Sequence, residues 1–169
     1  IAKFDSAGAY LWSKSLGDWE EYRGFHMAVD AWGNLILAGS FDIGLDLGGG
    51  VLTPAGNYDV FVAKFGPDGG HLWSMRFGDW DEQFCGGVCV DAFGSMVITG
   101  AFESTIDFGG GVLTSAAYND IFVAKFGADG AHLWSKRFGD AKAIPPSPTY
   151  SDDWGSSVAV DAAGHLIIA

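Results

Sequence analysis

The chain of 169 residues is poor in several features, and each scarcity excludes a class of protein. Nine Lys and Arg stand against 21 Asp and Glu, and the net charge of −12 argues against binding to nucleic-acid phosphates. No run of about 18 apolar residues occurs, so no membrane span is expected. Only 5 Pro occur, and the 26 Gly follow no Gly-X-Y period, which excludes a collagen-like chain.

Motifs of metal sites and nucleophilic catalysis are also missing. The sequence has no H-x-x-x-H, C-x-x-C or G-x-S-x-G pattern. Cys85 and Cys89 lie too far apart along a strand to bridge each other, so we predict small buried thiols. His71 and His132 stand where an otherwise similar segment has Tyr10, which argues against a metal or catalytic histidine. We therefore expect no tightly bound transition metal and no catalytic Ser or Cys.

The chain does contain a repeat. Lys3, Lys64 and Lys125 recur every 61 residues, and Val62–Gly78 and Val123–Gly139 are identical at 14 of 17 positions. In the third copy the interval from Asp91 to Asp161 is nine residues longer, because of a Pro-containing insertion around residues 141–150. A period of this size indicates a propeller, a solenoid or an array.

Four short apolar runs alternate with turn signals within each repeat. Residues 87–91, 96–101, 60–65 and 71–77 show the Val, Ile and Phe enrichment of strands. Asp-x-x-Gly and Gly-x-Asp-Gly sequences separate them, and we expect Asp side chains to close these turns and the final Gly to take a positive φ. The sequence thus predicts an all-β fold: a β-propeller of four-stranded antiparallel blades with a period of 61.

The pattern FVAKF-x-x-x-G-x-x-LWS-x-x-FG followed by VAVD-x-x-G-x-LIIA resembles the bacterial SBBP repeat, named for "seven-bladed β-propeller". The resemblance covers nearly the whole chain. It implies the propeller fold and a secreted or cell-surface bacterial protein, and little about activity. This chain departs from the pattern in its long links between the second and third strands of each repeat, which we expect to be Gly-rich loops.

The repeat divides the chain into a half-blade at 1–16, blades at 24–77 and 85–138, and a half-blade at 155–169, with twelve strands in all. Three blades are fewer than a closed ring needs. We expect further blades of the same polypeptide, preferred here, or other copies of the chain to complete the ring. In either case Leu166–Ile168 should pair with a strand equivalent to Val62–Phe65.

Recurring residues are expected to be architectural. Trp12, Trp73 and Trp134 occupy equivalent strand positions and should be mostly buried between blades rather than form a ligand ring. The stems of Lys3 and its equivalents should cover apolar surface. Small residues, such as Gly86 and Gly87, should lie near the crowded axis.

The candidate binding surface is the end of the blades that carries the longer links, because loops on a rigid scaffold are where binding usually resides. Its candidate residues are Trp19, Glu21, Trp80, Glu82, Asp152 and Trp154. Exposed aromatics beside carboxylates suit a protein or a carbohydrate partner. No cofactor is expected except calcium, for which Asp46 and Asp107 in the Gly-rich links are the candidates, with turn capping as the alternative.

The favoured hypothesis is a non-catalytic binding or scaffold module. Two alternatives stay open: a carbohydrate-active lyase or hydrolase that uses loop carboxylates, and a structural repeat of an extracellular fibre. Glycoside hydrolysis needs two carboxylates about 5 to 9.5 Å apart, and the sequence does not single out such a pair. Acids at repeated positions favour a structural role, because catalysis needs one unique constellation.

Overall fold

The structure is a computed structural model that describes residues 1–16, 22–116, 118–140 and 152–169. The described part is all-β, with sixteen strands in antiparallel sheets and no helix. Two sheets have four strands each, in the orders β3-β4-β7-β8 and β9-β10-β13-β14. The first comprises β3 (Tyr22–Val29), β4 (Leu35–Phe41), β7 (Asp59–Phe65) and β8 (His71–Phe77). The second comprises β9 (Gln83–Val90), β10 (Met96–Phe102), β13 (Asp120–Phe126) and β14 (His132–Phe138).

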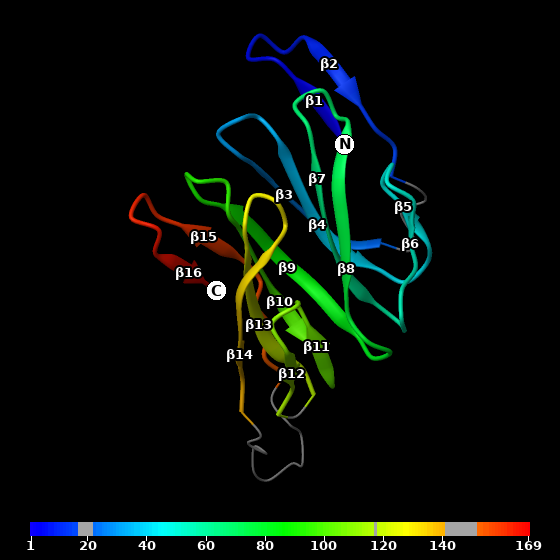
Figure 1. Cartoon of the computed structure of the whole chain (residues 1–169), viewed down its shortest axis with the longest axis vertical. Coiled ribbons are helices and arrows are strands. Elements are labelled where there is room, and N and C mark those ends of the chain that lie inside the picture. Colours follow the sequence, from blue (N-terminus) through cyan, green and yellow to red (C-terminus); the bar gives the residue numbers. More distant parts are fainter. Residues whose placement is uncertain (17–21, 117, 141–151) are drawn as a thin grey trace.

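The strand order within both sheets is the one expected from the hairpin signals. Two-stranded sheets lie at the ends of the chain: β1 (Ala2–Phe4) with β2 (Tyr10–Ser13), and β15 (Val158–Val160) with β16 (Leu166–Ile168). In Figure 1 the β3–β4 and β9–β10 turns lie at the upper left, and the link from β8 to β9 lies at the opposite, lower right end of the sheets. An antiparallel sheet of this order requires that separation.

The number of strands corrects one expectation. The long links are not plain loops, because each contains a short hairpin: β5 (Leu45–Asp46) with β6 (Val51–Leu52), and β11 (Thr105–Asp107) with β12 (Val112–Thr114). Apolar side chains at alternate positions form these short strands, but the neighbouring Gly-Gly-Gly runs made the segments resemble loops in the sequence. Leu45 and Leu47 point into one core cluster, and Ile106 and Phe108 into the other. The links therefore contribute core side chains.

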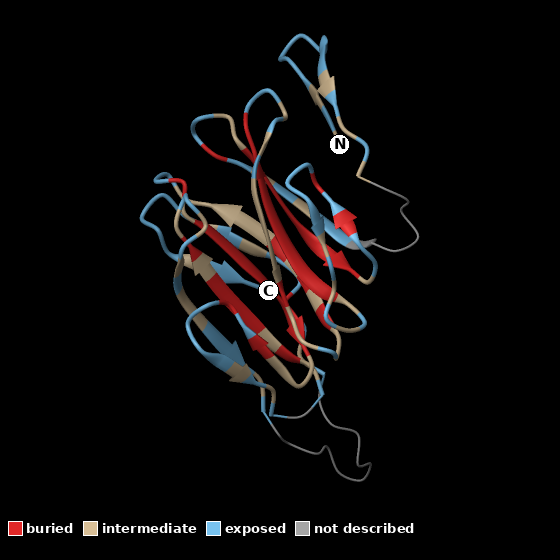
Figure 2. Ribbon diagram, turned by 45° about the vertical axis from the view of Figure 1, so that its right-hand side comes forward, coloured by how far each residue is buried: buried red, intermediate tan, exposed pale blue. Residues whose placement is uncertain are grey.

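The two complete sheets pack face to face. Successive residues of β4 belong to different clusters: Leu35 and Leu37 to one, Ile36 and Ala38 to the other. The first sheet is therefore covered on both faces, by the hairpin β1–β2 on one and by the second sheet on the other. Figure 2 shows the buried residues concentrated in the central strands of the two sheets, while the terminal hairpins are mainly exposed.

The first strands of successive sheets are neighbours. β9 lies against β3 and β4 of the preceding sheet, and β15 lies against β9. The contact is close: a methyl group on Gly86 would lie 1.9 Å from the carbonyl oxygen of Gly155, and one on Gly87 would lie 3.1 Å from the Cα of Ser157. Glycine is needed at Gly86 because no side chain fits there.

Turn chemistry follows the sequence. The Asp5, Asp30, Asp91 and Asp161 carboxylates each accept hydrogen bonds from the backbone amides two and four residues later. The closing glycines of both turn classes have φ values between 79° and 87°, a region that favours glycine. They are Gly8, Gly33, Gly69, Gly94, Gly130 and Gly164.

The exchange of Tyr for His between repeats also has a structural reason. Tyr10 Oη lies 3.1 Å from Ser13 Oγ, while His71 Nε2 lies 3.1 Å from Ser74 Oγ and His132 Nε2 lies 3.2 Å from Ser135 Oγ. The three side chains therefore satisfy the same hydroxyl group three residues later. The His71 ring also fills the space above Gly49, where a methyl group would lie 2.2 Å from Cε1.

Lys3, Trp12 and Lys64 link one sheet to the next, a role that stem burial alone did not predict. Lys3 Nζ and Trp12 Nε1 both donate to the carbonyl oxygen of Pro67, each at 2.9 Å, in the β7–β8 turn. One repeat later, Lys64 Nζ donates to the carbonyl oxygen of Ala128 at 3.1 Å, in the β13–β14 turn. We call this contact the turn latch.

Trp12, Trp73 and Trp134 are each mostly covered and none lies open on the surface, which confirms the expectation that they are mostly buried, although none is completely buried. Trp12 and Trp73 pack against the two core clusters, and Trp134 lines a pocket. The edge positions of β8 and β14 in their sheets account for the partial exposure of Trp73 and Trp134.

The ion pair between Lys64 Nζ and Asp30 Oδ2, which lie 3.1 Å apart, predicts an acid-dependent loss of stability. Burial of the Asp30 carboxyl raises its pKa, but hydrogen bonds from Asn34, Lys64 and the Trp32 amide outweigh burial and hold the pKa below 3.8. The folded state thus binds fewer protons than the unfolded state. The stabilisation from Asp30 is therefore complete at pH values above the unfolded-state pKa, and it is lost as the pH falls through the folded-state pKa. We expect Asp30→Asn to flatten the fall of Tm between about pH 6 and pH 2, measured by circular dichroism. Parallel Tm curves for the variant and the parent would contradict this.

Candidate functional site

The strongest candidate site lies at the end of the sheets that carries the inter-strand links. We define the acid–aromatic surface as Trp80, Asp81, Glu82, Glu103, Asp152 and Trp154. The structure brings three of the predicted residues, Glu82, Asp152 and Trp154, into one region with Glu103. Trp80 directly precedes the two acids on the β8-to-β9 link. Trp19 and Glu21 were also predicted, and they lie outside the described residues.

The aromatic part of this surface is a stack of rings. The Trp154 indole stacks on Phe84, with centroids 5.4 Å apart and planes at 27°. Phe84 in turn lies 5.3 Å from the Tyr58 ring. Trp154 remains 50% exposed, and Trp80 is 76% exposed, so both indoles offer apolar area to a partner. A ring that is fixed by stacking yet exposed on one side loses little conformational entropy when a ligand covers it.

The acidic part centres on Glu103, which sequence reasoning missed. Burial, and then the nearby carboxylates of Asp81, Glu82 and Asp152, raise the pKa of Glu103. Four carboxyl groups therefore share one region, and a cation placed among them would be attracted by all four. A signal was available in the sequence, because Asp42 stands one period earlier, at the same place after the second strand.

Backbone contacts hold this surface in place. The Glu103 amide donates to the carbonyl oxygen of Glu82 at 2.9 Å, which ties the end of β10 to the β8-to-β9 link. Asn119 Nδ2 donates to Asp152 Oδ1 at 3.2 Å, and the Asp153 amide donates to the carbonyl oxygen of Asn119 at 2.9 Å. The segment with Trp154 is thereby anchored beside the start of β13.

Other acidic side chains near the acid–aromatic surface stabilise the fold through hydrogen bonds and ion pairs. Asp79 accepts hydrogen bonds from the Asp81 amide, the Gln83 side chain and the Thr105 hydroxyl and amide. It therefore joins the β8-to-β9 link to β11. Asp59 and Asp120, which no motif pointed to, are fully buried and form ion pairs with the partly exposed Arg76 and Arg137.

The calcium candidates serve as turn caps. Asp46 Oδ1 accepts the amides of Gly48 at 2.8 Å and Gly50 at 3.3 Å, and Asp107 Oδ1 accepts those of Gly109 at 2.7 Å and Gly111 at 3.1 Å. Within the described ranges, no group of three or more His, Cys, Asp or Glu side chains is arranged to hold a metal ion. The two aspartates thus match the capping alternative.

The two cysteines are unbridged, and Cys85 is buried while Cys89 is half-buried. Burial raises the pKa of the Cys85 thiol to about 12. Burial and the neighbouring Asp91 carboxylate raise that of Cys89 to about 11. Both thiols are therefore protonated at neutral pH and are weak nucleophiles.

Comparison with known proteins gives one distant relationship. No family model matches the chain. The Regulatory protein FlaEY of Caulobacter vibrioides is 28% identical over 150 residues, which are 84% of this chain and 16% of that protein. The chain thus spans about a sixth of the relative's length. No helix in the described part of the chain is long and apolar enough to cross a membrane.

Proposed function

We propose that the chain is a section of a β-propeller and serves as a non-catalytic binding module of a secreted or cell-surface bacterial protein. Three observations support the propeller: two four-stranded antiparallel sheets of identical order, neighbouring first strands, and a turn latch that repeats with the sequence period. The resemblance to SBBP repeats agrees with this proposal, and so does a relative whose name is that of a regulatory protein.

The observation that carries the binding role is the acid–aromatic surface. Four carboxyl groups beside two exposed indoles match a partner that presents lysine or arginine side chains. The carboxylates would steer such a partner by its charge, and the Trp154 and Trp80 rings would hold it by cation–π contact. The net charge of −12 extends the same attraction over the whole molecule. A carbohydrate is the other partner class, because sugar rings also stack on exposed indoles.

Binding to a lysine- and arginine-rich peptide should depend on Trp154. We expect Trp154→Ala to weaken binding about 30-fold, because truncation of an exposed anchor residue typically costs about 2 kcal/mol. The measurement is isothermal titration calorimetry at low ionic strength, and added salt should weaken binding by the parent.

The matched control is Trp32→Ala, because Trp32 is 60% exposed but lies in the β3–β4 turn at the opposite end of the sheet. Binding lost on Trp32→Ala and kept on Trp154→Ala would place the site at the end of the sheets that carries the β3–β4 turn, and would contradict the proposal. If a glycan panel binds and the basic peptide does not, the carbohydrate partner replaces the protein partner.

A catalytic role is the second candidate, and the raised pKa of Glu103 favours it. A carboxyl with a raised pKa close to a second carboxyl group is the arrangement that glycoside hydrolases use for a general acid and its partner. Release of reducing sugars from acidic or neutral polysaccharides, abolished by Glu103→Gln, would support an enzyme. Binding without turnover would support the module.

A further inference from the structure

Two aspartates of the chain are followed directly by glycine: Asp68 in the β7–β8 turn and Asp129 in the β13–β14 turn. The sequence contains no other Asp-Gly pair and no Asn-Gly pair. Because glycine has no Cβ, its backbone nitrogen is open to the carboxyl group of the residue before it. An aspartyl residue isomerises to an isoaspartyl residue most readily in this pair.

Both carboxyl groups are exposed and face the backbone that follows them. Asp68 Oδ1 and Asp129 Oδ1 each accept the amide two residues later, at 3.0 Å in both turns. The aspartates of the other turn class differ, because Asp30 and Asp91 are paired with lysines and are followed by alanine. A reactive pair of residues and an accessible carboxyl group therefore coincide at Asp68 and Asp129.

The folded turns keep the glycine nitrogen atoms away from this reaction. Gly69 N donates to the carbonyl oxygen of Gly66, and Gly130 N donates to that of Gly127, each at 2.9 Å. The two bonds go with φ values of 82° at Gly69 and 87° at Gly130. A nitrogen held in this way is not free to turn onto the carboxyl carbon. The turn must open first, and local opening competes with every contact that holds the turn.

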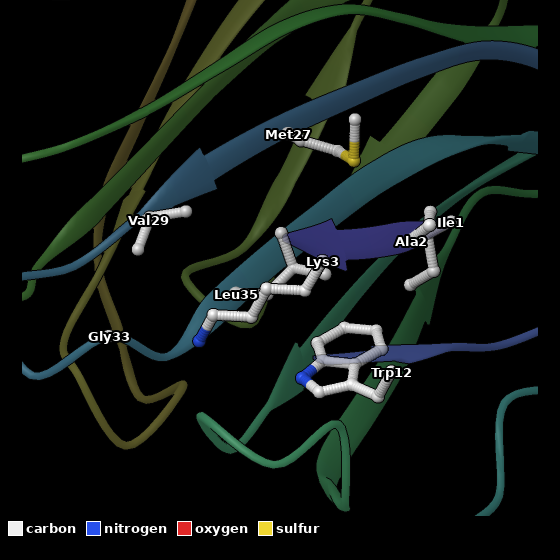
Figure 3. A pocket seen from close by; sticks show the side chains of 8 residues that line it. All are labelled: Ile1, Ala2, Lys3, Trp12, Met27, Val29, Gly33 and Leu35. Atoms are coloured by element: carbon white, nitrogen blue, oxygen red, sulfur yellow. The ribbon is translucent and has the colours of Figure 1, made fainter. Parts of the chain in front are cut away.

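The turn latch is one of these contacts. The Pro67 carbonyl, which belongs to the peptide group before Asp68, accepts two donors, Lys3 Nζ and Trp12 Nε1. Figure 3 shows these two side chains side by side, with their nitrogen atoms on the same side of the hairpin β1–β2. The Ala128 carbonyl, next to Asp129, accepts Lys64 Nζ at 3.1 Å. Each latch thus closes on the peptide group beside a reactive aspartate.

We propose that Asp68 and Asp129 are sites of isoaspartate formation and that the turn latch controls its rate, a property separate from the binding function proposed above. The Gly130 nitrogen attacks Cγ of the protonated Asp129 carboxyl group. A C–N bond forms, and the carboxyl hydroxyl leaves with the amide proton as water. Water then attacks the Asp129 backbone carbonyl carbon and breaks its bond to the Gly130 nitrogen. The water released equals the water consumed, so no oxidant, reductant or other reactant is needed.

The product has a longer main chain, which now runs through Cβ and Cγ of the residue. The Gly130–Gly127 hydrogen bond no longer closes the turn, and the Ala128 carbonyl loses its place opposite Lys64. Isomerisation would therefore loosen the link between the two complete sheets at this end. Because two donors hold the Asp68 turn and one holds the Asp129 turn, Asp129 should react faster in the folded protein.

The test is incubation of the folded chain in mildly acidic buffer made with heavy-oxygen water, followed by digestion and chromatography with mass detection. Isoaspartyl peptides separate from aspartyl peptides, and heavy oxygen marks each residue that has passed through the succinimide. Lys64→Met keeps the apolar stem and removes the ammonium. We expect about tenfold faster reaction at Asp129, because a hydrogen bond from a charged donor shifts an opening equilibrium by about that factor. The rate at Asp68 should not change.

The matched control is Asp30→Asn, which removes the ion-pair partner of Lys64 but leaves the lysine to donate to Ala128. It should leave the ratio of the two rates unchanged. Equal acceleration at both sites by Lys64→Met would mean that the whole fold, and not the latch, protects Asp129, and would overturn the proposal.

Measurements on the parent chain in urea keep the proposal testable if Lys64→Met fails to fold. Unfolding should accelerate both reactions and abolish the difference between Asp68 and Asp129. Equal rates in the folded and unfolded chain would show that the turns give no protection. An absence of isoaspartate even in the unfolded chain would show that neither residue is a site of the reaction.

Discussion

Replacing Asp59 with alanine is expected to lower the free energy of unfolding by about 3 kcal/mol, because it leaves a buried backbone donor and a partly exposed guanidinium without their acceptor. The Asp59 carboxylate is fully buried and lies 2.5 Å from Arg76 Nη1. It also accepts the Ala55 amide at 2.8 Å, which fixes the link between β6 and β7. The variant would therefore leave a guanidinium and a backbone donor without their acceptor.

Urea unfolding followed by tryptophan fluorescence is the measurement. Asp46→Ala is the matched control, because Asp46 also caps backbone amides, but on an exposed turn. Its cost should stay at or below about 1–2 kcal/mol. Asp120→Ala should repeat the large effect in the second sheet, since Asp120 is equally buried and pairs with Arg137. Equal losses for Asp59→Ala and Asp46→Ala would contradict the assigned role of the ion pair.

Replacing Phe126 with alanine is the second large expected effect, about 3–5 kcal/mol of lost stability, because it would open a cavity between the two complete sheets. The Phe126 ring stacks on Phe77, meets Phe108 edge-on at 6.1 Å, and lies 6.1 Å from the His132 ring. It thus joins the first sheet, the second sheet and the β11–β12 hairpin.

Calorimetric Tm values would measure this loss. The control is Phe93→Ala, because Phe93 is 83% exposed in the β9–β10 turn, and its removal should change stability by less than about 0.5 kcal/mol. A small effect of Phe126→Ala would mean that the two sheets are not held by this cluster.

The strands and turns of this protein were predictable because their signals are local. Alternation in Val-Ala-Lys-Phe, Asp at the first turn position and Gly at the last specify strand and turn without reference to the rest of the chain. The 61-residue period then fixed the order of strands in each sheet. The short hairpins escaped prediction because only two or three residues of each strand alternate, too few to separate from a Gly-rich loop.

Features that depend on two distant positions were missed. Asp59 and Arg76 are 17 residues apart, and nothing in either segment marks them as partners. Lys64 reaches Ala128 at a separation of 64 residues, across two sheets. Burial, and then carboxylates on two other segments of the chain, raise the pKa of Glu103. The sequence therefore predicted part of the candidate site. The tryptophans and acids of the links could be identified from the sequence, but their proximity in space could not.

The sequence by itself determined the repeated unit: four strands, their turns and their alternating faces, because each is set by steric and hydrogen-bonding preferences within a few residues. Only the tertiary structure decided which of those faces are covered. Phe4 and Phe126 stand in the same Ala-Lys-Phe context, yet one is exposed and the other is buried. The difference lies in the neighbouring sheet, because burial depends on what packs against a side chain and not on the residues beside it in sequence.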